Sequence, residues 1–117
     1  MSASPYDIII EQGTTWTLVI SLKDPDNLPV DLTGYTAKCQ IRKPPPAEDS
    51  LLAEPTAVIY DPPTKGVIIL KLEADVTSEL DFLTGNYDVV LKAGTGEVVR
   101  LLAGKATLSP STTVFES

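Results

Sequence analysis

The chain of 117 residues contains no histidine and a single cysteine, Cys39. Without histidine it lacks the side chain that most often serves as a general base and as a metal ligand near neutral pH. A Cys–His nucleophilic pair is therefore excluded. A lone thiol cannot form an internal disulfide, which predicts assembly in a reducing cytoplasm.

Other patterns that carry chemistry are also missing. The chain has no G-x-S-x-G elbow and no P-loop. Asp88 and Glu97 flank a glycine-rich turn, but a glycosidase pair needs a cleft that so short a chain scarcely provides. We therefore expect no enzymatic activity, no catalytic residue and no cofactor.

Four oxygen-bearing side chains lie close together in the sequence: Asp24, Asp26, Asn27 and Asp31. They lack the central glycine and the bidentate glutamate of an EF-hand calcium loop. Aspartate and asparagine next to proline favour a turn held by side-chain hydrogen bonds to the backbone. We expect such a turn and no metal site, with calcium binding as the alternative.

Basic residues are scarce, with nine Lys and Arg against sixteen Asp and Glu and a net charge of −7. Binding to nucleic-acid phosphates or to an anionic membrane depends on basic side chains, so neither partner is expected. No apolar run approaches the roughly 20 residues that cross a bilayer. Residues 1–5 lack the basic and apolar regions of a signal peptide, which predicts a protein that is not secreted. The acidity either keeps the protein soluble or favours a basic partner surface.

What the chain does have is a regular alternation of apolar and mostly polar residues. One apolar set comprises Trp16, Leu18, Ile20 and Leu22, and another comprises Ala37, Cys39 and Ile41. A period of two places each set on one face of a half-buried strand, as in antiparallel sheets. The turn residues between the two runs predict that they form a hairpin. Trp16 is expected to anchor the core, and Cys39 to be a small buried hydrophobe.

Further strands are expected at residues 6–11, 51–54, 57–60, 67–72, 87–92 and 98–108. The run 67–72 is apolar on both sides and should lie centrally. A short helical turn is expected near residues 75–81. Asp75 would cap this turn, and Val76 and Leu80 would share one face that closes the end of the sheets. Gly104 is expected to mark a bulge or bend in the last strand.

Seven or eight strands with turns roughly every ten residues predict an all-β fold, an antiparallel Ig-like β-sandwich. A small barrel is the competing architecture. We expect an N-terminal arm over 1–5, a single β-sandwich domain over 6–110 and a C-terminal tail over 111–117.

Several motifs together resemble a family of small β-sandwich structural proteins from tailed bacteriophages. They are Glu11-Gln12-Gly13, Leu32-Thr33-Gly34-Tyr35-Thr36-Ala37, Ile41-Arg42, and the runs 66–70, 85–89 and 96–110. The resemblance covers nearly the whole chain and implies a virion protein encoded near tail-fibre or baseplate genes. The family supplies no catalytic residues to transfer. It implies a virion location and, as partners, other virion structural proteins (baseplate and tail fibre) in multiple symmetric copies.

The resemblance makes an adaptor that connects tail fibres to the baseplate the leading hypothesis. A capsid cement or decoration protein is an alternative with the same fold. A glycan-binding module is an alternative of another class, although sugar platforms need exposed aromatic side chains and this chain has few.

Two segments depart from the family pattern and are the candidate partner interface. Pro44, Pro45 and Pro46 favour a stiff polyproline excursion that suits docking in a partner groove. Val114 and Phe115 are apolar residues on a tail that follows the last strand. An ordinary exposed loop, and a tail folded back on its own core, are the alternatives.

Overall fold

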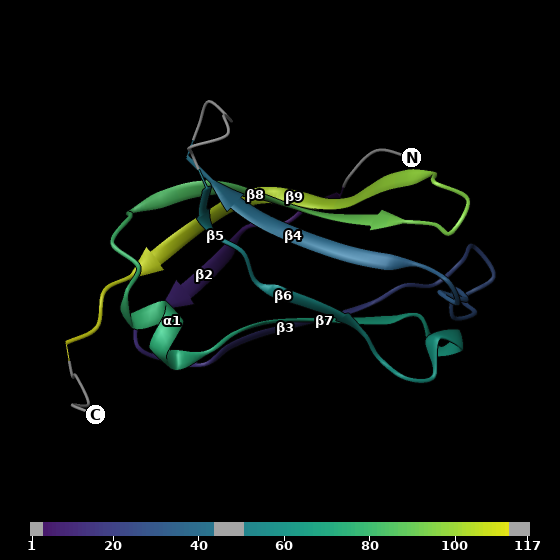
Figure 1. Ribbon diagram of the computed structural model, residues 1–117, viewed down its shortest axis with the longest axis horizontal. Helices are drawn as coiled ribbons and strands as arrows, with labels where there is room; N and C mark the ends of the chain where they lie inside the picture. The colour runs from purple at the N-terminus through teal and green to yellow at the C-terminus, as the bar shows by residue number, and fades with distance from the viewer. Residues whose placement is uncertain (1–3, 44–50, 113–117) are drawn as a thin grey trace.

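The computed structural model describes residues 4–43 and 51–112. Over these ranges the chain forms nine strands, one short α-helix and one 3-10 turn. The strands make a six-stranded sheet and a three-stranded sheet, and Figure 1 shows the two stacked as layers. The predicted all-β sandwich is therefore confirmed. No helix in these ranges is long and apolar enough to cross a membrane.

The larger sheet contains six strands, including the first and the last strand of the sandwich. Its members are β1 (Ser4–Pro5), β2 (Ile8–Glu11), β9 (Val98–Ser109), β8 (Thr84–Lys92), β4 (Thr36–Arg42) and β5 (Leu51–Ala53). The β8–β9 hairpin closes through the predicted turn, where the Ala93 N–H donates to the Glu97 carbonyl at 2.8 Å. β1 and β2 pair with β9 in parallel, so the sheet is mixed rather than purely antiparallel. Ser4 and Pro5, which were expected in the arm, thus form part of the sheet.

The smaller sheet is antiparallel, in the order β3 (Trp16–Ser21), β7 (Val67–Leu72), β6 (Thr56–Ile59). The predicted hairpin between residues 16–23 and 36–42 is therefore wrong, because β3 pairs with β7 while β4 pairs with β8 in the other layer. Alternation shows which face of a strand is buried, but it does not show which strand lies next to it. Two apolar faces are buried equally well when their strands are neighbours in one sheet and when they face each other across the core. The connection over residues 22–35 is long enough to span the roughly 10 Å between layers.

The strand order follows that of immunoglobulin-like sandwiches. β4, β8 and β9 take the places of the C, F and G strands, and β3, β7 and β6 those of B, E and D. In the seven-strand form of that fold the first strand lies beside B. Here the N-terminal strands lie beside β9 instead. As a result, β3 is an edge strand of the smaller sheet.

The core lies between the layers and confirms the direction of alternation predicted for the runs that form β3, β4 and β8. Its fully buried side chains come from both sheets and, with Leu32, from the connection between β3 and β4; they include Ile10, Leu32, Cys39, Ile41, Ile68, Leu70 and Val89. Trp16 is half-buried and packs against this cluster, as expected of a core anchor. The run 67–72 is the central strand of its sheet, as predicted.

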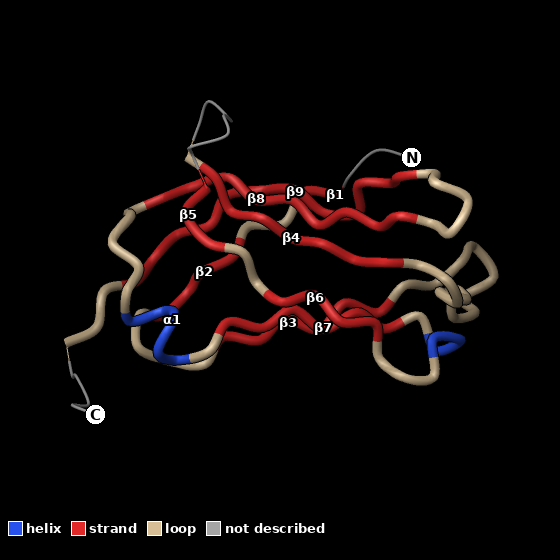
Figure 2. Tube along the Cα trace, viewed as in Figure 1, coloured by secondary structure: helices blue, strands red, loops and turns tan. Residues whose placement is uncertain are grey.

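Helical turns close the two ends of the sandwich (Figure 2). At one end lies η2 (Pro63–Lys65), and at the other α1 (Ala74–Ser78). The predicted helical turn is present, and Leu80 is buried as expected, but two details are wrong: Glu73, not Asp75, is the N-cap residue and makes no side-chain cap, and Val76 is 44% exposed. Thr77 is the second buried residue here, three positions before Leu80. Because both form contacts across the end, they determine which side of this short helix faces inward.

Thr77 joins α1 to the turn between β2 and β3. Its hydroxyl oxygen accepts the Gly13 N–H at 3.0 Å, and the hydroxyl donates to the Thr14 carbonyl at 2.7 Å. The Gln12 side chain donates to the Leu80 carbonyl at 2.9 Å and accepts the Ser111 N–H at 3.0 Å. These four hydrogen bonds, which we call the clasp, connect residues 12–14 to residues 77–80 and to Ser111 at one end of the sandwich, so this segment acts as scaffold.

Gly104 serves close packing rather than a bulge. The shift in register between β8 and β9 leaves Leu101 without a partner, three residues before the predicted position. At Gly104, a Cβ atom would lie 2.2 Å from the Tyr6 carbonyl oxygen. The missing side chain allows the N-terminal segment to cross the edge of β9.

Candidate functional site

The sequence-predicted partner interface lies outside the described residues. Pro44, Pro45 and Pro46 fall between the two described ranges, and Val114 and Phe115 fall after the second. Their role in binding a partner therefore stays a prediction from the sequence.

The acidic turn forms the side-chain hydrogen bonds that its sequence predicted. One Asp24 carboxylate oxygen accepts the N–H groups of Asp26 and Leu28, both at 2.9 Å. One Asp31 oxygen accepts the hydroxyl of Thr33 at 2.6 Å and its N–H at 3.0 Å, and these bonds lower the pKa of Asp31. Nowhere in the two described ranges do three or more Cys, Asp or Glu residues group as metal ligands would.

Cys39 is buried on the inner side of β4, with 1% of its surface exposed. Burial, together with the negative charges of Asp88 and Glu54, raises its pKa to about 12. The thiol is therefore protonated at neutral pH, whereas nucleophilic cysteines depend on the thiolate. The expected role as a small buried hydrophobe is confirmed by its place in the core.

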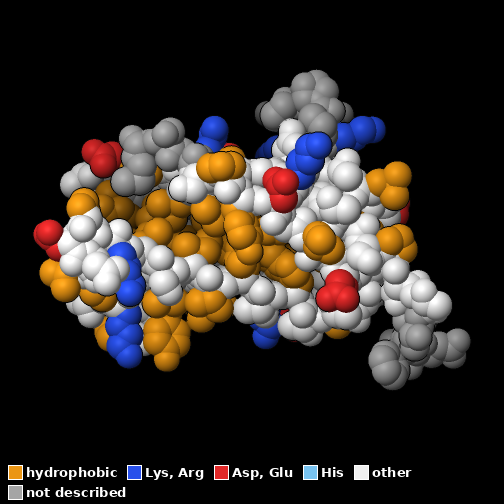
Figure 3. Space-filling model, turned by 180° about the vertical axis from the view of Figure 1, so that it is seen from behind, with side chains coloured by type: hydrophobic (Ala, Val, Ile, Leu, Met, Phe, Trp, Pro, Cys, Tyr) orange, Lys and Arg blue, Asp and Glu red, His pale blue; other side chains and the backbone are white. Residues whose placement is uncertain are grey.

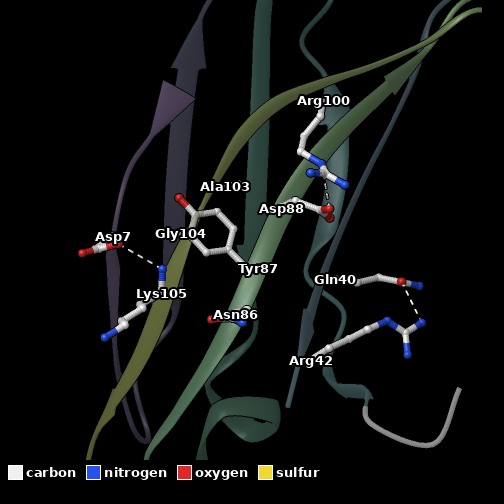
Figure 4. Close-up of a pocket in the computed structure, with 10 residues that line it drawn as sticks. All are labelled: Asp7, Gln40, Arg42, Asn86, Tyr87, Asp88, Arg100, Ala103, Gly104 and Lys105. Carbon is white, nitrogen blue, oxygen red and sulfur yellow. Dashed lines mark hydrogen bonds and ion pairs between the residues drawn. The ribbon is translucent and has the colours of Figure 1, made fainter. Parts of the chain in front are cut away.

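A shallow groove crosses the outer face of the larger sheet and is the candidate site. It has a volume of about 710 Å³ and is lined by β4, β8 and β9 together with Asp7. Side chains reach it because alternate residues of adjacent strands project from the same face. Figure 4 shows how the lining residues lie: Asp7, Gln40, Arg42, Asn86, Tyr87, Asp88, Arg100, Ala103, Gly104 and Lys105. A smaller hollow shares Gln40 and Asp88 and continues the groove toward Lys92.

Cross-strand pairing arranges these side chains in rows. Arg42 lies opposite Asn86, and Asn86 opposite Lys105. The next row joins Gln40 and Asp88. The bulge at Leu101 alters the alternation on β9, so that Arg100 lies opposite Val90 and projects from the outer face three residues before Ala103. The bulge thereby adds a cation to the groove.

The face is basic although the chain is acidic. Five of the nine basic residues lie on it, namely Lys38, Arg42, Lys92, Arg100 and Lys105. Arg100 Nε lies 3.3 Å from Asp88 Oδ2, and Lys38 Nζ lies 3.7 Å from Glu54 Oε2. Exposed pairs of this kind stabilise a fold by at most about 1 kcal/mol, so they set a charge pattern more than they hold the sheet together.

Sequence reasoning missed this face. The polar residues of each strand were recognised as solvent-facing, but their gathering depends on the order of β4, β8 and β9. A sequence signal did exist, because the expected strands 36–42, 87–92 and 98–108 together hold most of the basic residues. Arginine and lysine side chains, with an amide donor beside them, are suited to bind carboxylates.

Tyr87 closes the groove from below. Its hydroxyl donates to the Tyr6 carbonyl at the crossing point beside Gly104. Asp7 Oδ1 accepts the Lys105 N–H at 3.0 Å, which ties the same segment to β9. Burial is the main cause that raises the pKa of Tyr87 to about 12, and the nearby ionisable groups of Cys39, Tyr6 and Asp7 add to it. The phenol is therefore a neutral hydrogen-bond donor that positions the wall of the groove.

A scan against protein-family models and a search of curated proteins both found no match for this chain.

Proposed function

We propose that this protein is a non-enzymatic structural component of a tailed-phage particle, and that it acts as an adaptor between tail fibres and the baseplate. Two observations support the proposal. The motifs that resemble the phage family hold scaffold positions, such as Gln12, which donates to the Leu80 carbonyl, and Gly13, which donates to Thr77. The outer face of the larger sheet is a broad polar surface that a partner protein would contact over several strands.

The basic character of that face carries the docking part of the proposal. Complementary charge speeds association and selects among partners. An acidic surface on a baseplate or fibre protein would face Lys92 and Lys105, whose side chains make no ion pair within residues 4–43 and 51–112. From its net charge, the chain was expected to favour a basic partner surface. For this face of the larger sheet we propose an acidic partner surface instead.

The position of this protein within the phage particle tests the proposed role as an adaptor. Electron micrographs of particles carrying a label on this protein should show the label at the baseplate or at the fibre attachment point. Label over the head would favour the cement alternative and overturn the adaptor. Absence of the protein from purified particles would overturn both.

A charge-matched pair of variants tests the docking face. The double variant Lys92→Glu, Lys105→Glu changes the net charge from −7 to −11, since each substitution contributes −2. The control Lys23→Glu, Lys65→Glu makes the same change at exposed positions away from the groove. The first variant should incorporate into particles at least tenfold less than the control. Equal incorporation would contradict docking through this face.

A further inference from the structure

The outer edge of β3 has no neighbouring strand within the described part of the chain. Beside β3, the Leu22 N–H donates to the Gly66 carbonyl at 2.8 Å. Backbone groups in an antiparallel ladder alternate in direction, so Ile20 and Leu18 also face β7. The N–H and C=O groups of Thr17, Val19 and Ser21 therefore point away from β7, toward the open edge.

This edge lacks the features that keep strands apart. β3 carries no charged residue, no proline and no shift in register against β7. Proteins commonly protect exposed edges with charges, prolines or bulges, and an unprotected edge is a template for another strand. β6, the other edge strand of this sheet, is also uncharged, but it has four residues against the six of β3 and directly follows Glu54 and Pro55. β3 is thus the longer unprotected edge and the one best suited to pairing.

The outer face of the smaller sheet has an apolar row that ends at this edge. Val58 lies opposite Ile69, and Ile69 lies opposite Val19. Val58 and Val19 are 57% and 58% exposed. In the larger sheet, by contrast, the corresponding outward positions hold mostly polar and charged side chains. The row would continue across a second strand placed beside β3.

The inner side of β3 is also incompletely covered. Its inward residues Trp16, Leu18 and Ile20 are half-buried, whereas Ile68 and Leu70 of the adjacent strand are fully buried. Figure 3, which views the molecule from behind, shows apolar side chains gathered across the middle of that face of the molecule. A strand added at β3 would bury surface on both of its faces.

We propose that two copies of this chain pair through β3, antiparallel, about a two-fold axis at Val19. In this register Val19 lies opposite Val19 of the second copy, and Thr17 lies opposite its Ser21. Every N–H and C=O group that points to the open edge then has a partner, because paired residues of this type exchange both hydrogen bonds. The two smaller sheets merge into one continuous sheet.

A second copy fits this edge better than an unrelated partner for two reasons. The edge groups are self-complementary about Val19, as an isologous two-fold contact requires. The strand is also uncharged in a chain of net charge −7, so two mutually repelling copies meet where they carry no charge. The proposal concerns the purified protein and does not depend on the role in a phage particle.

Matched substitutions on the two edge strands test the pairing. Val19→Lys places two like charges opposite each other across the axis, which destabilises a cross-strand pair. Val58→Lys makes the same change on the same face, at nearly equal exposure, away from the axis. Sedimentation velocity should show dimers for the wild type and Val58→Lys, and at least tenfold weaker association for Val19→Lys. An equimolar mixture of Val19→Lys and Val19→Glu should restore dimers, which a folding defect would not do.

A cross-linking experiment fixes the register. Residues opposite each other in a hydrogen-bonded pair have Cα atoms about 5.5 Å apart, within the range of a disulfide. Val19→Cys should therefore form an intermolecular disulfide under mild oxidation, while Val58→Cys should not, and buried Cys39 contributes little background. A monomeric wild type at high concentration would overturn the proposal. Equal dissociation by both lysine variants, or equal cross-linking by both cysteines, would also overturn it.

Discussion

The outer faces of the two sheets of this sandwich differ in chemical character. The larger sheet has a basic, polar outer face, and its β9 edge is covered by the N-terminal strands. The smaller sheet has an apolar row on its outer face and an uncovered edge at β3. Both sheets bury their inner faces in the same core. Strand alternation ensures burial on one side only, and the other side is left to be shaped by contacts with solvent or with partners.

The position of the N-terminal strands accounts for the difference between the edges of the two sheets. By pairing with β9 they close one edge of the larger sheet and leave β3 open. The clasp at Thr77 then holds the two layers together at the end where β2 turns into β3. Three changes would break or sharpen the contrast between the sheets.

The largest effect is expected from Gly104→Ala, which removes the cover from the β9 edge. A Cβ atom at this position would meet the Tyr6 carbonyl oxygen at 2.2 Å, and backbone cannot move aside as a flexible side chain can. We expect a loss of more than about 4 kcal/mol in the free energy of unfolding, measured by urea denaturation. Gly94→Ala is the control, because the nearest atom to its Cβ is at an ordinary 3.6 Å. Equal stability of the two variants would contradict the close crossing.

Alkaline pH should weaken the larger sheet, whose inner side carries the ionisable groups Cys39 and Tyr87. Folding raises the pKa of Cys39 from 9.0 to about 12 and that of Tyr87 from 10.0 to about 12. Above pH 9 the unfolded chain therefore loses protons that the folded chain keeps, and the free energy of unfolding falls as pH rises toward 12. Cys39 alone should contribute a loss of about 2–3 kcal/mol by pH 11.

Urea denaturation between pH 8 and pH 11 measures this loss. Cys39→Ala separates the contribution of the thiol, because the variant should show a shallower decline with pH whatever its stability at pH 8. Parallel declines in the wild type and the variant would show that the thiol does not contribute.

A smaller effect is expected from Thr77→Val, which opens the clasp between the sheets. The Gly13 N–H and the Thr14 carbonyl would lose the hydroxyl that they share. Leaving buried polar groups without partners costs about 1–2 kcal/mol in the free energy of unfolding. Thr77→Ser retains the hydroxyl and is the control. Hydrogen exchange should locate the effect at the turn between β2 and β3, and an unchanged exchange rate at Gly13 would count against the clasp.

Much of the fold could be predicted from the sequence because local periodicity reports burial directly. The inward positions of β4 and β8, such as Cys39, Tyr87 and Val89, follow from a period of two. The Asp24 turn follows from side chains that bond their own backbone. The inward side of α1 did not follow, because Thr77 is buried through partners far away in the sequence. The basic groove was missed for the same reason, since its residues come from three strands.

By itself, the sequence determined the all-β class, the positions of most strands and, for the clearly alternating strands β3, β4 and β8, the side that faces the core. These properties depend on neighbouring residues and on the hydrophobic effect, which is not directional. Only the tertiary structure decided that β3 pairs with β7, that the N-terminal strands cover β9 and that the bulge at Leu101 brings Arg100 onto the outer face. Strand partners are chosen by the packing of the whole sandwich, and an alternating pattern is compatible with several partners.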